Sequence, residues 1–161
     1  MPSVLFVCLG NICRSPMAEA VFRHLVAQAG LSDHIQADSA GTGAWHVGSA
    51  PDRRATAAAS SQGVALSGQA RRIEPEDFER FDLILAMDAS NLRDLRALAG
   101  SPEERAKVRL LREFDPDSAG GRDLDVPDPY YGGEDGFGTV FGLVRAACEG
   151  LLEEIRAGRL P

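Results

Sequence analysis

Short apolar runs alternate along this chain with longer segments in which apolar residues recur at helical spacing. Residues 4–7 are a continuous apolar run, which is typical of a strand buried on both faces of a parallel sheet. From Ser15 the apolar positions recur every fourth residue, which predicts a helix that ends near Gly30. The beginning of the chain therefore predicts a strand, a tight loop and a helix.

The same alternation continues to the end of the chain. Three further segments predict strands, at residues 35–38, 81–87 and 107–111. Segments of helical pattern predict helices at residues 52–62, 74–80, 88–100 and 135–157. Two stretches rich in Gly, Ser, Asp and Pro are expected to be loops, residues 39–52 and 115–135.

Strands that alternate with helices predict a parallel sheet built with right-handed crossovers. We therefore expect an α/β fold: a small four-stranded parallel sheet with helices on both faces, in a flavodoxin-like three-layer sandwich. The chain has 161 residues and shows no repeat, linker or low-complexity tract. This length predicts a single domain over residues 1–161.

Composition and charge narrow the class of protein. Hydrophobic residues make up 44% and charged residues 25%, with no apolar run long enough for a membrane span and no signal peptide at the start. The net charge of -7 argues against a nucleic-acid partner, which usually needs a basic face. Three cysteines without an export signal indicate reduced thiols, and hence a cytoplasmic protein.

The sequence "CLGNICRS" connects the first predicted strand to the first predicted helix. Ligands bind beyond the carboxyl ends of parallel strands, and the N–H groups of a helix N-terminus suit an anion. Gly and Asn in the loop readily adopt positive φ, and Arg adds a planar fork of donors for phosphate. We expect a phosphate-binding loop made of Leu9, Gly10, Asn11, Ile12, Cys13, Arg14 and Ser15.

Cys8 stands at the start of this loop, where N–H dipoles and a guanidinium favour a thiolate. A thiolate that faces a bound phosphate can attack phosphorus, giving a cysteinyl-phosphate that water then hydrolyses. No metal or other cofactor is expected, because Arg14 and the loop N–H groups can stabilise the phosphate oxygens. A cysteine alone is more often a small core residue, so the strand–loop–helix setting carries the catalytic interpretation.

A general acid is expected to protonate the leaving oxygen. The segment 115–135 contains several Asp residues, and the physical chemistry of the sequence alone does not choose among them. Its "PDPYYGG" stretch also has the composition of a surface turn.

The segment "VCLGNICRSPMAEAVF" resembles the signature of the low-molecular-weight protein tyrosine phosphatases. Further similar segments run along nearly the whole chain: "DSAGT", "ARR", "SNLRDL" and "DPYYGG". The resemblance implies that Asp128 is the general acid, and later the base that activates water. It also implies that Tyr130 and Tyr131 lie at the mouth of the pocket, where a phenol ring could pack against them.

The resemblance assigns supporting roles to residues of the loop. It implies that the Ser15 hydroxyl contacts the Cys8 sulfur, although Ser is also a common helix cap. It implies that Asn11 holds the loop in shape with Ser39 as its partner. Relatives often have a histidine in this network, at the position of Gly68, and the effect of that departure stays open.

Two further residues have both a functional and a structural interpretation. The resemblance implies that Cys13 captures an oxidised Cys8 as a reversible disulfide, and the alternative is a small residue that fills the loop. It places Trp45 on the pocket wall, and the alternative is an anchor for a long loop. His24, His34 and His46 lack metal-ligand spacing and are expected to be surface or hydrogen-bonded residues, and Cys148 is expected in the core.

The substrate implied by the resemblance is phosphotyrosine in a protein or peptide, with a cognate tyrosine kinase acting opposite. A protein arginine phosphatase on the same scaffold is an alternative, but that group tends to have threonine in place of Ile12 and to lack a tyrosine at position 130. A thioredoxin-coupled arsenate reductase would need an extra cysteine pair, which the middle of the chain lacks. An inactive phosphate- or phosphoprotein-binding module is the remaining alternative, against which the presence of Cys8, Arg14 and Asp128 argues.

Overall fold

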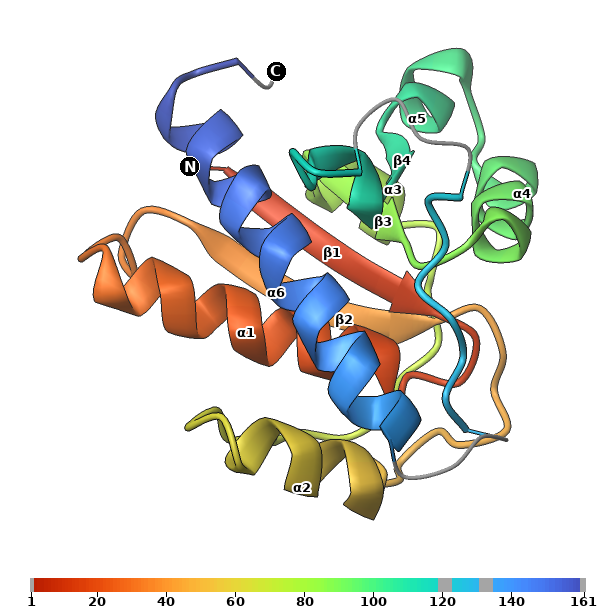
Figure 1. Cartoon of the computed structure of the whole chain (residues 1–161). Coiled ribbons are helices and arrows are strands. Elements are labelled where there is room, and N and C mark those ends of the chain that lie inside the picture. Colours follow the sequence, from red (N-terminus) through yellow and green to blue (C-terminus); the bar gives the residue numbers. More distant parts are fainter. Residues whose placement is uncertain (1, 119–122, 131–134, 160–161) are drawn as a thin grey trace.

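Four parallel strands form the sheet at the centre of the molecule (Figure 1). The computed structural model describes residues 2–118, 123–130 and 135–159. The strands lie in the order β2–β1–β3–β4, and each neighbouring pair is parallel. Their bounds are β1 Ser3–Cys8, β2 Gln36–Gly41, β3 Leu83–Ala86 and β4 Val108–Leu110. The predicted four-stranded parallel sheet is confirmed.

The helices in the described part of the chain are α1 Arg14–Gln28, α2 Arg53–Ser60, α3 Asp77–Arg80, α4 Ala89–Leu98, α5 Pro102–Ala106, the 3-10 helix η1 Leu111–Phe114 and α6 Asp135–Arg156. The sequence does not predict α5 or η1, because helices this short show no apolar period. The helix predicted at 74–80 begins only at Asp77, since residues 75 and 76 form a turn. Among these helices none is both long and apolar enough to cross a membrane.

β1 separates two apolar cores. Phe6 packs in the core beneath α1 and α6, where its ring centroid lies 5.6 Å from that of Phe22. Val7, the next residue, lies in the opposite core with Phe78 of α3 and Leu95 of α4. Helices therefore cover both faces of the sheet, and the predicted three-layer sandwich is confirmed (Figure 1).

β2 extends beyond the predicted strand and ends at Gly41. Its last residues pair with β1, with Ser39 opposite Phe6 and Gly41 opposite Cys8. Ser and Gly are typical of loops, but pairing with a central strand outweighs that weak propensity here. Glycine suits position 41 because a Cβ there would lie 2.7 Å from the Leu9 carbonyl oxygen. The end of β2 thus makes room for the loop that follows β1.

The direction of winding reverses at β1. The chain passes from β1 to β2 on one side, and then crosses to β3 on the other side of β1. In open parallel sheets such a switch point leaves a crevice at the carboxyl ends of the strands, where ligands bind. Cys8 is the last residue of β1 and so lies at this crevice.

Candidate active site

Hydrogen bonds to neighbouring segments shape the loop between β1 and α1. The Thr42 N–H donates to the Cys8 carbonyl oxygen at 2.9 Å, and the Gly43 N–H donates to the Leu9 carbonyl oxygen at 2.9 Å. Asn11 has a φ of 58°, a left-handed conformation that asparagine adopts more readily than most residues. The loop turns sharply at Asn11 and returns its chain toward Cys8.

The Cys8 thiol lies at the base of a pocket and is almost completely buried. Its Sγ lies 3.0 Å from Ser15 Oγ and accepts a hydrogen bond from the Asn11 N–H at 3.3 Å. Donors of this kind stabilise a thiolate. Ser15 contacts the sulfur instead of capping α1, since the residue at the helix cap is Cys13.

Asn11 joins the loop to its surroundings through both atoms of its amide. Its Nδ2 donates to Ser15 Oγ at 2.8 Å and to Ser39 Oγ at 3.0 Å. Its Oδ1 accepts from the Arg71 N–H at 3.0 Å. Ser39 in turn donates to Glu19 Oε1 of α1 at 2.7 Å, and burial raises the pKa of that carboxyl. The structure thus brings Asn11, Ser15 and Ser39 together, as the resemblance implies.

Gly68 leaves open space where the resemblance would place a histidine. Its φ is +88°, and no atom lies within 4 Å of the position that its Cβ would take. The Asn11 amide nevertheless has a partner for its oxygen in the Arg71 N–H. The glycine is therefore compatible with an intact Asn11 network.

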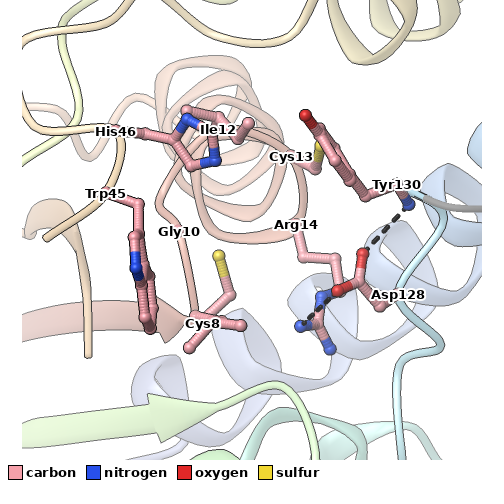
Figure 2. A pocket seen from close by; sticks show the side chains of 10 residues that line it. Cys8, Gly10, Ile12, Cys13, Arg14, Trp45, His46, Asp128 and Tyr130 are labelled. Atoms are coloured by element: carbon pink, nitrogen blue, oxygen red, sulfur yellow. Dashed lines mark hydrogen bonds and ion pairs between the residues drawn. The ribbon is translucent and has the colours of Figure 1, made fainter. Parts of the chain in front are cut away.

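Arg14 is buried at the N-terminus of α1 and points into the pocket (Figure 2). Its Nη1 donates to Asp88 Oδ2 at 2.7 Å and to the Val126 carbonyl oxygen at 2.9 Å. Its Nη2 lies 3.6 Å from Asp128 Oδ2. Burial lowers the pKa of Arg14, but the negative groups around it raise that pKa by more, so the guanidinium stays charged.

Asp88 fixes the orientation of Arg14 but was not predicted as a site residue. Asp88 caps α4, where its Oδ1 accepts from the Asn91 N–H at 2.8 Å, and its Oδ2 holds Arg14. A signal for it was present, because Asp88 comes just after β3, the strand next to β1. The carboxyl ends of adjacent parallel strands lie at the same edge of a sheet.

Asp128 and Tyr130 lie on the extended segment that passes the C-terminal end of β1 (Figure 1). The Asp128 side chain is 36% exposed, and its Oδ1 accepts from the Tyr130 N–H at 3.0 Å. The Tyr130 ring faces the ring of His46 across the mouth of the pocket, with centroids 6.1 Å apart. Tyr131 lies outside the described residues.

The pocket has a volume of about 380 Å³. Figure 2 shows Cys8 and Arg14 deep in it, with Trp45 on one wall and Asp128 and Tyr130 on the other. Its lining residues are Cys8, Leu9, Gly10, Ile12, Cys13, Arg14, Trp45, His46, Asp128 and Tyr130. The candidate residues from three distant parts of the chain therefore meet in one cavity.

Trp45 and His46 form the wall opposite Asp128 and Tyr130. Trp45 is 75% exposed, so it is no buried anchor, although its ring lies so close to Gly43 that a Cβ there would overlap it. His46, expected at the surface or in a hydrogen-bonded position, is half-buried and lines the pocket, a role that the sequence does not predict. The sequence carried no signal for this, because the wall forms only when a long loop folds over Gly10.

Cys13 also lines the pocket, and the residue is almost completely buried. Burial, with a further contribution from the carboxylate of Asp52, raises the pKa of Cys13 to about 12. Cys148 lies in the core as predicted, and burial raises its pKa as well. Cys8, Cys13 and Cys148 are all free thiols.

The geometry suits nucleophilic attack on a bound phosphate ester. A sulfur with hydrogen-bond donors lies beside a loop of N–H groups, a charged guanidinium is close by, and a carboxylic acid lies at the mouth. Within the described residues, no group of three or more His, Cys, Asp and Glu side chains could hold a metal ion. The fold and the site together define an α/β protein with a cysteine and an arginine on the loop between its first strand and first helix.

Comparison with known proteins agrees with this class. The family model described as low molecular weight phosphotyrosine protein phosphatase matches residues 3–159. A low molecular weight protein-tyrosine-phosphatase of Streptomyces coelicolor is 56% identical over 153 residues, which is 95% of this chain and 93% of that protein. The human low molecular weight phosphotyrosine protein phosphatase is 45% identical over 153 residues, 94% of each chain.

Solved structures show the same similarity. The crystal structure of a protein tyrosine phosphatase from Entamoeba histolytica has a TM-score of 0.93 at 37% identity, covering 99% of this chain and all of that one. An arginine phosphatase from Drosophila has a TM-score of 0.86 at 37% identity, covering 94% of this chain and 96% of that one. The chain belongs to the low molecular weight phosphotyrosine protein phosphatase family.

Proposed function

We propose that this chain hydrolyses phosphotyrosine in proteins and peptides through a cysteinyl-phosphate intermediate. The observation that carries the proposal is the convergence of Cys8, Arg14 and Asp128 on one pocket of about 380 Å³. A nucleophile lies at its base, a cation beside the nucleophile and an acid at its mouth. The Streptomyces and human relatives, both named as tyrosine phosphatases, support the same function.

In the first step the Cys8 thiolate attacks phosphorus, and the bond from phosphorus to the phenol oxygen breaks. The loop N–H groups and Arg14 hold the three equatorial oxygens, where negative charge is distributed. Protonated Asp128 gives its proton to the leaving oxygen, which departs as a neutral phenol. The products are the phenol and a phosphate group bonded to sulfur.

In the second step water attacks the cysteinyl-phosphate. The Asp128 carboxylate, left by the first step, takes a proton from the water, and the bond from sulfur to phosphorus breaks. Sulfur leaves as a thiolate, which Ser15 Oγ at 3.0 Å and the Asn11 N–H at 3.3 Å are placed to stabilise. Inorganic phosphate is released, and the protein returns to its starting state.

The walls of the pocket favour an aromatic substrate. Trp45 and Tyr130 face each other across the mouth (Figure 2), where a phenol ring could lie between them. The apolar Ile12 also lines the pocket. An arginine phosphatase is the second candidate, because the chain also resembles the Drosophila enzyme in structure. Ile12 and Tyr130 favour the phosphotyrosine substrate.

The same proposal extends to the location of the protein in the cell, its cofactors and its partners. The chain would act as one domain in the cytoplasm, without a metal or cofactor, on phosphoproteins that a cognate tyrosine kinase supplies. Neither nucleic acid nor a membrane is expected as a partner. Cys8 and Cys13 both line the pocket. After a peroxide oxidises Cys8 to a sulfenic acid, the Cys13 thiol would condense with it to a disulfide and release water.

The experiment measures phosphate release from matched phosphotyrosine and phosphoarginine peptides in the presence of EDTA. The Cys8→Ser protein is the control, since it keeps the phosphate-binding loop but lacks the nucleophile. We expect release from the phosphotyrosine peptide alone, and none from the control.

Preferential release from phosphoarginine would keep the mechanism and overturn the substrate assignment. Phosphate binding without release from either peptide would instead place the protein among phosphate-binding modules.

A further inference from the structure

A series of contacts through Arg54 joins the phosphate-binding loop to the loop that carries Asp128. The Asp52 N–H donates to the Ile12 carbonyl oxygen at 2.8 Å. Asp52 Oδ1 accepts from the Arg54 N–H at 2.8 Å and lies 3.3 Å from Arg54 Nε. Arg54 Nη2 donates to the Tyr130 carbonyl oxygen at 3.0 Å. The Tyr130 N–H completes the series by donating to Asp128 Oδ1 at 3.0 Å.

The Arg54 guanidinium also packs on two aromatic rings. Its central carbon lies 5.5 Å from the centroid of the Tyr130 ring and 4.7 Å from that of Phe137 in α6. Arginine stacks on aromatic faces in this way, so the side chain holds the segment by its ring and by its backbone. Arg54 therefore ties Tyr130 both to α2, on which it stands, and to α6.

Among the described residues, the segment that carries Asp128 is held by contacts on either side of this residue. Asp125 supplies two of them: its Oδ1 accepts from the Ala89 N–H at 2.9 Å, and its carbonyl oxygen accepts from Arg112 Nη1 at 2.6 Å. Residues 123–129 have no helix or strand structure of their own. On the N-terminal side of Asp128 the segment is also anchored at Val126. The Val126 N–H donates to the Met87 carbonyl oxygen at 2.6 Å, and the Val126 carbonyl oxygen accepts from Arg14 at 2.9 Å. On the C-terminal side of Asp128 the segment is anchored at Tyr130, whose carbonyl oxygen accepts from Arg54. The direct approach of Asp128 to Arg14, at 3.6 Å, is longer than a hydrogen bond.

We propose that Arg54 is a positioning residue for the general acid: by holding Tyr130 it sets the Asp128 carboxyl over the phosphate-binding loop. The inference rests on the proposed function, in which Asp128 protonates the leaving oxygen. A proton transfer of this kind needs the acid within hydrogen-bond reach of that oxygen, so a small displacement of the loop lowers its efficiency.

The chemistry of the contact calls for arginine. The guanidinium pairs with Asp52 through Nε while another nitrogen, Nη2, reaches Tyr130. A lysine ammonium is a single point charge without this planar fork, and it stacks less well on rings. A lysine at position 54, in the Arg54→Lys protein, is therefore expected to position Asp128 only in part.

The test compares aryl phosphates with poor and good leaving groups, phenyl phosphate and 2,4-dinitrophenyl phosphate. The parameter is kcat/KM, which reports the steps up to formation of the cysteinyl-phosphate. We expect Arg54→Met to lower kcat/KM for phenyl phosphate roughly 10-fold, a part of the 10²- to 10⁴-fold that a general acid contributes. The effect on dinitrophenyl phosphate should be less than about 2-fold, since its phenolate leaves without a proton. Arg54→Lys should lie between Arg54→Met and the unaltered protein.

Two controls separate positioning from a general structural effect. Arg53→Met removes an exposed arginine from the adjacent position of α2 and should leave kcat/KM unchanged for both substrates. Inhibition by inorganic phosphate should be the same in Arg54→Met, because the phosphate-binding loop stays intact. In an Asp128→Ala background, Arg54→Met should add no further loss.

Equal losses on both substrates, or a further loss in the Asp128→Ala background, would overturn the proposal. If Asp128→Ala itself lowered kcat/KM equally for both substrates, the acid assignment would fail, and positioning by Arg54 would fail with it. If the unaltered protein released no phosphate at all, the failure would be that of the proposed function.

Discussion

Ser15 lies between the reactive sulfur and the network that shapes its loop. Its Oγ is 3.0 Å from Cys8 Sγ and accepts a hydrogen bond from Asn11 Nδ2 at 2.8 Å. A hydroxyl has one hydrogen to donate, and accepting from Asn11 leaves that hydrogen able to point at the sulfur. The Ala40 carbonyl oxygen, 3.4 Å from Ser15 Oγ, is a second acceptor within reach of that hydrogen. We expect the hydroxyl to donate to the closer sulfur when Cys8 is a thiolate, the form in which it would leave in the second step.

Replacing Ser15 by Ala should slow breakdown of the cysteinyl-phosphate more than its formation. A hydrogen bond to a charged group contributes about 1.5–3 kcal/mol, so kcat should fall roughly 10- to 100-fold. The measurement is a stopped-flow burst of phenol followed by slow turnover, with Ser60→Ala, an exposed serine of α2, as the matched control. A fall in kcat without any burst would contradict this role.

The raised pKa of Cys13 predicts how the reactivity of this thiol depends on pH. Burial and Asp52 raise that pKa from an ordinary value of 9.0 to about 12, so Cys13 stays a neutral thiol far above neutral pH. In the Cys8→Ser protein, alkylation of Cys13 by iodoacetamide should keep accelerating from pH 9 to about 11, because only the thiolate reacts.

Mass spectrometry of the digested protein measures this rate separately for Cys13. Asp52→Asn, which keeps a residue able to cap α2, removes a negative charge and should lower the pKa of Cys13. A rate that levels off near pH 9 in the Cys8→Ser protein would show that burial does not hold the thiol neutral.

Among the helices, α6 shows how one missing side chain permits close packing. Gly150 faces η1, and a Cβ at this position would lie 1.7 Å from the Phe114 carbonyl oxygen. The exposed Gly142, two turns earlier in the same helix, has no atom within 4 Å of its Cβ position. The two glycines therefore have different physical roles within one element.

We expect Gly150→Ala to lower the free energy of unfolding by roughly 1–3 kcal/mol, because the backbone of η1 must move. Gly142→Ala should raise it by about 0.5–1 kcal/mol, since alanine favours a helix interior over glycine. Urea unfolding followed by circular dichroism measures both. A rise in the free energy of unfolding in both variants would show that helix propensity, and not the contact with Phe114, governs α6.

At the scale of the whole molecule, the topology was predictable because its signals are local. Apolar runs mark β1 and β3, and helical spacing marks α1 and α6, so alternation alone predicts the parallel sheet. The position of the loop with Cys8 follows from that alternation, since the end of the first strand is where such sheets bind ligands.

The parts of the site that the sequence did not predict depend on contacts between distant segments. Asp88 meets Arg14 only because β3 lies beside β1. His46 lines the pocket only because a long loop folds back over Gly10. Arg54 reaches Tyr130 only once α2 and the segment that carries Tyr130 are both in place. No local pattern of residues encodes the contacts of His46 and Arg54, whereas the position of Asp88 just after a predicted strand is a signal for the first contact.

The hydrogen bonds of Asn11 and Ser39 have a consequence for regulation by the product. Because the protein's own groups already hold the loop in shape, an anion can bind without a large cost in ordering the chain. The advantage applies equally to a substrate and to the inorganic phosphate that remains after turnover. If the loop binds phosphate as proposed, we expect inorganic phosphate to inhibit the protein, so that its rate of turnover falls as the concentration of free phosphate around it rises.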